Sequence, residues 1–265
     1  MTGHQTFTAP RADGQHTPLC LYPPPPDIAK PPLALISHGA GGSEMGYGYL
    51  ARALQTAGWR VLVMAHAESG LEVLQAKIKA SGFRDGLLEL VSDPAVYQAR
   101  LLDIAAALDA AETLGQSDYR LLLGHSMGSA TVMVEAGVAN HLGASGLDRF
   151  DAYAALSPHG PGRWFPPQAW RSIHKPMLLV TGTADQPLEG DWHSRLLPFD
   201  DLPPGGKWLA VIANATHMHF AGIGPGVRQT EDATTAVLLA FLAAVRSDTP
   251  AAPPPAIAHT TLRAK

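Results

Sequence analysis

The sequence predicts an α/β protein with a mostly parallel central sheet and helices on both faces. Between residues 33 and 245, short apolar runs typical of buried strands alternate with helical patterns, and this alternation favours a parallel sheet. Glycine-containing turns follow several of the runs. Functional groups collect at the carboxyl ends of parallel strands, so these turns are the first places to look for a site.

Composition supports one globular domain. The chain has 265 residues, 46% of them hydrophobic and 16% charged, with a net charge of -4, which is long enough for a substantial core. No basic run suggests nucleic acid. The single cysteine, Cys20, excludes an intramolecular disulfide and a cysteine zinc cluster. No signal-like start or spanning apolar run is visible, so we expect a cytoplasmic protein; a mature chain whose signal was removed would look the same.

The N-terminal segment is expected to contribute little to the core. Residues 1–16 are polar and mixed, which predicts a poorly ordered start. Residues 17–22 favour an edge strand, because the four prolines that follow at 23–26 cannot donate to a sheet ladder.

The remaining elements follow from periodicity and from the residues that end them. Compact apolar runs predict strands at 33–37, 59–65, 119–123, 150–156, 177–181 and 207–213. Helical patterns occur at 49–56, 70–80, 84–91, 94–114, 129–136 and 230–245. Gly58 ends the first helix and Pro94 opens the long one.

These elements predict one domain over residues 17–246, without repeats or a second domain. The short span between residues 156 and 175 leaves no room for a large lid. The helical stretch 68–93 is an insertion that could form part of a cover. The Ala- and Pro-rich tail, 247–265, is expected to be disordered.

The most informative pattern is Gly124-His125-Ser126-Met127-Gly128, between an apolar strand and a helix. A serine on such a turn, with glycine two residues to either side, is typical of a nucleophile elbow. Larger side chains at the glycine positions would collide with the strand or the helix. The alternative is a glycine-flanked loop serine, because short motifs also match by chance. The flanking strand and helix favour the nucleophile.

A serine nucleophile needs a base and a group that orients the base. Asp185 follows a strand and a glycine turn, which favours it as the acid; a helix-capping aspartate is the alternative, and Asp191 is the second choice. His217 lies shortly after the last strand and is the expected base, with His219 as its competitor. The chain order of serine, acid and histidine agrees with one known arrangement of the triad.

The negative oxygen of a tetrahedral intermediate needs fixed N–H donors. We expect one from Met127, directly after the serine, and one from Ala40 in the glycine-rich loop 38–42. A phosphate cradle is disfavoured because the loop lacks the Lys-Ser/Thr pair. Histidines 38, 125, 217 and 219 could lie together at the opening of the site, but their spacing in the sequence matches no zinc-binding pattern. We therefore expect no metal and no cofactor.

The substrate side is defined less sharply. Candidates for lining a pocket are aromatic residues and histidines near the predicted strand ends: His38, His125, His159, Trp164, Phe165 and His219. Trp170 could join Trp164 and Phe165 in walling it, or the rings could simply pack the loop on the body of the domain. Tyr97 and Trp192 are further candidates. No Arg or Lys cluster adjoins the motifs, which argues against a strongly anionic substrate.

At this point the chain resembles the α/β-hydrolase family over about residues 17–246. The resemblance rests on Ser37-His38-Gly39-Ala40-Gly41-Gly42, Gly124-His125-Ser126-Met127-Gly128, Thr181-Gly182-Thr183-Ala184-Asp185 and Ala215-Thr216-His217-Met218-His219-Phe220. Within the family, the chain looks most like a lidless bacterial branch of predicted dienelactone hydrolases and relatives of platelet-activating-factor acetylhydrolase and polyester hydrolases. Members commonly carry Gly-His-Ser-Met-Gly-Gly, and Ser129 replaces the last glycine here.

The resemblance implies a serine hydrolase of small-molecule carboxylic esters that works through an acyl-enzyme. True dienelactone hydrolases use a cysteine nucleophile, and dehalogenase relatives use an aspartate, so Ser126 disfavours both activities. Two alternatives stay open: acyl transfer or perhydrolysis on the same triad, and an idle scaffold that binds a ligand or partner. Fold alone does not fix function, and the sequence leaves the oligomeric state open.

Overall fold

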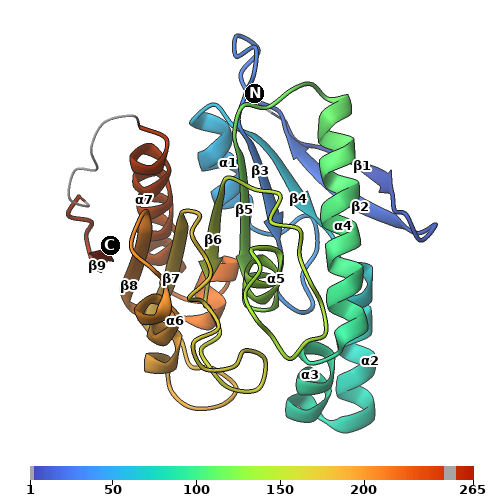
Figure 1. The fold of residues 1–265 in the computed structure, drawn as a ribbon. Coiled ribbons are helices and arrows are strands. Elements are labelled where there is room, and N and C mark those ends of the chain that lie inside the picture. The colour runs from blue at the N-terminus through green and yellow to red at the C-terminus, as the bar shows by residue number, and fades with distance from the viewer. Residues whose placement is uncertain (1–2, 248–254) are drawn as a thin grey trace.

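The computed structural model of the protein describes residues 3–247 and 255–265. The strands of these residues form one sheet in the order β1-β2-β4-β3-β5-β6-β7-β8-β9 (Figure 1). Their bounds are β1 (Gln5–Pro10), β2 (His16–Tyr22), β3 (Leu33–Ser37), β4 (Arg60–Met64), β5 (Arg120–His125), β6 (Ala152–Leu156), β7 (Met177–Ala184), β8 (Lys207–Thr216) and β9 (Thr260–Ala264). The six strands from β4 to β8 in this order are parallel, while β1, β2 and β9 are antiparallel.

The helices are α1 (Gly48–Thr56), α2 (Leu71–Ser81), α3 (Phe83–Val91), α4 (Pro94–Thr113), α5 (Met127–Glu135), α6 (Leu197–Asp201) and α7 (Val227–Val245). Short 3₁₀ turns are η1 (Ala67–Ser69), η2 (Trp192–Leu196) and η3 (His217–Ala221). None of the helices in the described ranges is long and apolar enough to cross a bilayer.

Helices cover both faces of the sheet, as the alternation of elements predicts. In β3, Leu35 packs with α4 and α5 on one face, whereas Ala34 and Ile36 pack with α1 and α7 on the other. Successive strand residues point to opposite faces, and a strand covered on both sides is apolar throughout. This explains why the central strands appear as continuous apolar runs in the sequence. No large lid domain is present in the described ranges (Figure 1).

The predicted central strands and the main helices are confirmed, with small differences at their ends. The strands β7 and β8 extend beyond the predicted residues 181 and 213. Sequence periodicity missed α6 and the three 3₁₀ turns, because elements of three to five residues are too short to show a repeat.

Both chain ends differ from the prediction. Residues 5–22 form an antiparallel hairpin, so β1 is the edge strand and β2 lies between β1 and β4. At the other end, β9 pairs with β8, with Val211 opposite Thr261. The prediction of a disordered tail is therefore wrong for residues 260–264; residues 248–254 lie outside the described ones. The strands β2 and β9 are held by β4 and β8, which are distant in the sequence, so local composition does not reveal these pairings.

Candidate active site

Ser126 lies on a sharp turn between β5 and α5. Its φ of 57° and ψ of -118° are unusual for a residue other than glycine, and its N–H donates to the Leu156 carbonyl at 3.0 Å. A Cβ on Gly124 would lie 2.2 Å from the Gly128 oxygen, and a Cβ on Gly128 would lie 2.1 Å from the Ser37 oxygen. Both positions therefore exclude any side chain, which is the physical reason for the spacing of the motif.

The structure brings Asp185 and His217 to this serine. His217 Nε2 lies 2.9 Å from Ser126 Oγ, and His217 Nδ1 lies 2.9 Å from Asp185 Oδ1. The second oxygen of Asp185 accepts from the Thr181 hydroxyl at 2.9 Å. Because an ionised carboxylate can only accept, Nδ1 carries the proton and Nε2 is free to accept from the serine hydroxyl.

The two competing residues lie elsewhere. Asp191 caps η2, where its side chain accepts from the His193 N–H at 2.8 Å. The ring of His219 accepts from the Thr216 N–H at 3.3 Å and so closes the capping box of η3. His219, also predicted as a pocket residue, has this structural contact instead.

Arg195 is the residue beside this site that the sequence analysis missed. Its buried guanidinium donates to the Asp185 backbone carbonyl at 2.9 Å and lies 3.2 Å from that residue's carboxylate. It also donates to the carbonyls of Ser157 and Pro158 at 2.8 and 3.0 Å. Arg195 thus ties the loop after β7 to the loop after β6. Local sequence offers no signal for it, since most arginines are on the surface.

The charge state of Asp185 follows from these neighbours. Burial opposes ionisation, but the hydrogen bond from His217 and the charge of Arg195 outweigh it, so the pKa of Asp185 lies below its ordinary value. The carboxylate is therefore charged at neutral pH and can hold the imidazole in one tautomer.

The loop 38–42 lies against the serine. A Cβ on Gly39 would be 3.2 Å from Ser126 Cβ, and the Gly42 N–H donates to the Gly39 carbonyl at 3.2 Å, which makes a tight turn around Ala40. The N–H groups of Ala40 and Met127 have no hydrogen-bond partner among the described residues. Both predicted oxyanion donors are thus unengaged beside the serine.

Two of the predicted pocket histidines are buried behind the site instead of lining it. His38 is fully buried, with Nδ1 2.5 Å from the Gly39 carbonyl and Nε2 accepting from the His66 N–H at 3.0 Å. His125 has its Nδ1 2.9 Å from the Tyr47 hydroxyl and its ring centroid 4.7 Å from that of His217. Burial lowers the pKa of both rings well below the ordinary value, so both are neutral.

The aromatic loop after β6 divides between the two predicted roles. His159 is half-buried, and its ring centroid lies 4.6 Å from that of Trp164. Both residues line a small hollow beside Arg195. Phe165 and Trp170 are completely buried and pack on each other at 5.5 Å. These last two hold the loop on the body of the domain, as the alternative interpretation states.

The insertion 68–93 forms a helical hairpin at the end of the sheet where β5 leads into α5 (Figure 1). Leu74 of α2 packs against Gly41 of the glycine-rich loop. The Trp164 indole donates to the Ser92 hydroxyl at 3.1 Å, and Arg84 donates to the Leu188 carbonyl at 3.4 Å. The hairpin therefore contacts the loops that surround the serine. Tyr97 supports it from α4 through a 3.0 Å bond to the Val91 carbonyl, whereas Trp192 stacks on His193.

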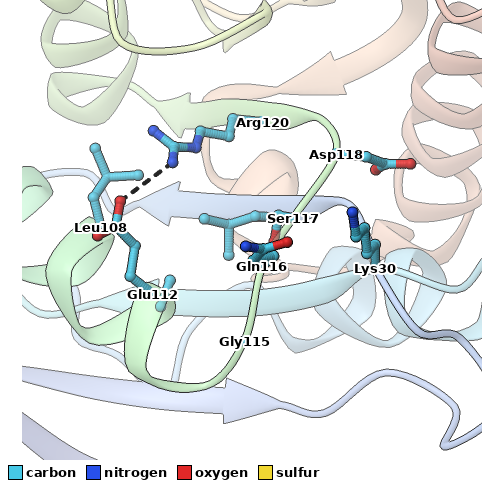
Figure 2. A pocket seen from close by; sticks show the side chains of 10 residues that line it. Lys30, Leu108, Glu112, Gly115, Gln116, Ser117, Asp118 and Arg120 are labelled. Carbon is cyan, nitrogen blue, oxygen red and sulfur yellow. Dashed lines mark hydrogen bonds and ion pairs between the residues drawn. The ribbon is translucent and has the colours of Figure 1, made fainter.

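A separate hollow of about 520 Å³ lies at the opposite end of the sheet, at the amino ends of β3 and β5 (Figure 2). Figure 2 shows Arg120 paired with Glu112 on its wall, at 3.4 Å, and Lys30 and Asp118 at the other side. It shares no residue with the Ser126 site. Within the described ranges, no group of three or more His, Cys, Asp or Glu residues is placed to hold a metal ion.

Known proteins similar to this chain are found by comparison of structures. No protein-family model matches the chain, and no curated protein matches it by sequence. Est1E from Butyrivibrio proteoclasticus is similar in structure, with 18% identity, a TM-score of 0.61, and coverage of 90% of this chain and 99% of that one. An esterase domain from Rhodothermus marinus has 17% identity and a TM-score of 0.60, covering 91% and 98%.

A dienelactone hydrolase from Anabaena variabilis is also similar, with 16% identity, a TM-score of 0.58, and coverage of 88% and 95%. These proteins share the α/β-hydrolase fold, so this chain has that fold as well. At such low identity these neighbours show the fold alone.

Proposed function

We propose that this protein is a serine hydrolase that cleaves carboxylic esters through an acyl-enzyme. The observation that carries the proposal is the continuous hydrogen-bonded chain from Ser126 through His217 to Asp185, with both steps at 2.9 Å. The three residues come from the carboxyl ends of three strands, far apart in sequence. Such a chain provides a nucleophile, a base and an orienting acid in the geometry that acyl transfer needs.

In the first half-reaction, Ser126 Oγ attacks the ester carbonyl carbon while His217 Nε2 takes the hydroxyl proton. The carbonyl oxygen becomes negative, and the N–H groups of Ala40 and Met127 stabilise it. When the tetrahedral intermediate collapses, the bond to the alkoxy oxygen breaks and His217 gives its proton to the leaving alcohol. Asp185 stays ionised and stabilises the imidazolium.

In the second half-reaction, water attacks the acyl-enzyme and again gives its proton to His217. The bond to Ser126 Oγ then breaks, the serine regains the proton, and the carboxylic acid leaves. The His217 side chain is 30% exposed, so water has access to the base. The same access admits an alcohol or peroxide, so assays with these acceptors added separate hydrolysis from acyl transfer.

The test uses a short p-nitrophenyl ester and a fluorophosphonate probe that labels activated serines. The wild-type protein should turn over the ester and be labelled, whereas Ser126→Ala should do neither while keeping its melting temperature. Ser43→Ala, which changes an exposed serine in the neighbouring loop, is the matched control and should behave as wild type. Turnover retained in Ser126→Ala would contradict the proposal, and an unlabelled wild-type protein would indicate an idle scaffold.

A further inference from the structure

A fully buried arginine lies behind the glycine-rich loop. Arg100 of α4 donates through Nη1 to the His38 carbonyl at 2.8 Å and to the Ser37 hydroxyl at 3.3 Å. Its Nε and Nη2 donate to the Ser69 hydroxyl at 3.1 and 2.7 Å. One guanidinium therefore connects α4, η1 and the end of β3.

Arg100 makes no direct ion pair among the described residues, although a buried cation without a partner is costly. Burial lowers its pKa to about 10, so it is still charged at neutral pH. The positive charge of Arg100 is compensated only indirectly. Ser37 Oγ lies 2.8 Å from His66 Nε2, and His66 Nδ1 lies 2.7 Å from Asp103. This path links the cation to a buried carboxylate.

This hydrogen-bonded series has the same residue types, serine, histidine and aspartate, as the proposed catalytic series. Its members Ser37, His66 and Asp103 are all buried, so no substrate reaches Ser37. Burial, with Arg100 and Arg11, lowers the pKa of His66 well below its ordinary value, so the ring is neutral. Its Nδ1–H donates to Asp103 and its Nε2 accepts from the Ser37 hydroxyl, which in turn accepts from Arg100. Every donor in the chain is matched, which fits a supporting network and not a second catalytic centre.

The network reaches the peptide groups on both sides of Ala40. Arg100 holds the His38 carbonyl, and the Ser69 carbonyl accepts from the Gly41 N–H at 2.8 Å. The Gly39 N–H donates to the Tyr47 hydroxyl at 3.1 Å, and the Gly39 carbonyl faces His38 Nδ1. The Ala40 N–H is left unpaired between these fixed groups. A donor held in this way needs no rearrangement when charge develops.

We propose that Arg100 is a positioning residue for the oxyanion loop: it fixes the loop from behind through His38 and Ser69, so that the Ala40 N–H points to the developing oxyanion. This inference rests on the proposed function. Loss of Arg100 should therefore weaken the binding of the transition state more than that of the ester, which lowers kcat and leaves KM almost unchanged.

The experiment compares Arg100→Met and Arg100→Lys with Arg60→Met. Arg60 is the matched control because it is also buried and donates to two backbone carbonyls, Leu114 at 2.9 Å and Gly115 at 2.5 Å, at the opposite end of the sheet. We expect Arg100→Met to lower kcat about 10- to 100-fold, less than the 10²–10³ that follows loss of an oxyanion donor itself. Arg100→Lys should lie between this variant and wild type, and Arg60→Met should keep its kcat.

A second readout separates positioning from general damage. A trifluoromethyl ketone accepts Ser126 Oγ and forms an oxyanion, whereas the matching secondary alcohol does not. In Arg100→Met the ketone should bind more weakly by the same factor as kcat/KM falls, and binding of the alcohol should be unchanged. If the variant does not fold, Arg100→Lys and Ser69→Ala carry the same measurements.

Three results would overturn the inference: an unchanged kcat in the Arg100 variants, equal losses of kcat in Arg60→Met, or equal weakening of the ketone and the alcohol. Failure of the proposed function looks different, because the wild-type protein would then show no Ser126-dependent turnover. The two failures are therefore distinguished in one assay: wild type and Ser126→Ala test the proposed function, and the Arg100 variants test the inference.

Discussion

Arg195 Nη2 lies 3.2 Å from Asp185 Oδ1, and the two side chains are 2% and 0% exposed. The same carboxylate oxygen faces His217 Nδ1 at 2.9 Å. Asp185 therefore belongs to two partnerships at once, a buried ion pair and the proposed catalytic chain. Its removal should affect stability through one and chemistry through the other, and the two effects can be measured apart.

Asp185→Asn should lower kcat/KM by about 10³- to 10⁴-fold, because the amide does not hold the imidazole in the required tautomer or stabilise its charged form. It should also destabilise the fold by about 3–5 kcal/mol, since the Arg195 charge is left buried without its partner. Steady-state kinetics and urea unfolding measure the two effects. An Asp185→Asn protein with near wild-type turnover would contradict the proposed role of this acid.

The double variant Asp185→Asn/Arg195→Met provides the matched test. With both charges gone, stability should recover by at least about 1 kcal/mol relative to Asp185→Asn, because replacing a whole buried pair costs less than breaking it. Turnover should stay as low as in Asp185→Asn. Recovery of turnover together with stability would mean that Asp185 acts only through the fold.

Asp185 should also make stability depend on pH in the acid range. The hydrogen bond from His217 and the charge of Arg195 outweigh burial and keep its folded pKa below the ordinary 3.8. The unfolded chain therefore takes up this proton first as the pH falls, so the stabilisation by Asp185 is present above about pH 5 and is lost below about pH 4. Urea unfolding of wild type and Asp185→Asn should show a difference that shrinks on acidification.

The buried Asp103 acts in the opposite sense, since burial raises its pKa to about 6 against the pull of Thr17 and Arg11. Its folded form binds a proton more readily than its unfolded form, so its contribution favours the fold as the pH falls. Asp103 is present in both proteins, and its effect cancels in the difference between them. A wild-type advantage that grows below about pH 4 would exclude the assigned pKa direction for Asp185.

Gly128→Ala should prevent correct folding of the elbow. The added Cβ would lie 2.1 Å from the Ser37 carbonyl oxygen, a backbone atom of the neighbouring strand that cannot move aside. We expect loss of folded protein, or a destabilisation above about 3 kcal/mol with no turnover. Gly190→Ala is the control, since no atom lies within 4 Å of its added Cβ, although its positive φ of 82° makes a small loss of stability expected. A stable and active Gly128→Ala protein would disprove this account of the motif.

Removal of residues 248–265 should lower stability and leave the chemistry intact. The tail supplies β9, which pairs with β8 over Trp208 to Ile212, and its Arg263 bonds to Asp200 at 2.8 Å. His217 follows the far end of β8 and depends on β7 and α5 for its partners. We expect a lower melting temperature with kcat within about threefold of wild type, since local stability is not uniform across a fold. An unchanged melting temperature would show that the β9 pairing is unimportant.

Much of this protein could be predicted from local patterns. The apolar runs of the parallel strands, the glycines of the elbow and the positions of Asp185 and His217 after their strands all leave signals within about ten residues. The structure brings Ser126, His217 and Asp185 into contact. The glycine-rich run 38–42 also predicted the loop that lies beside the serine.

The errors arise at residues and strands whose contacts leave no periodic signal. His38 and His219 lie near the site in sequence, but their rings bond to backbone groups that fold around them. The outer strands β1 and β9 form because a partner strand offers unpaired backbone groups. The partner of β9 is β8, far away in the sequence. The other contacts are short-range, since His38 faces Gly39, His219 faces Thr216 and β1 pairs with the adjacent β2, but such contacts leave no periodic pattern in the sequence.

The sequence by itself determined the order of the parallel strands and the main helices, the steric need for glycine around Ser126 and the chain order of the three proposed catalytic residues, because periodicity and turn sterics act between near neighbours. Only the tertiary structure decided which arginines are buried and what they hold. Arg100 and Arg195 resemble surface arginines in sequence, and their roles arise from carbonyls and carboxylates that the fold gathers from distant elements. Burial then makes these contacts strong, since a charge removed from water depends on the groups that replace its hydration.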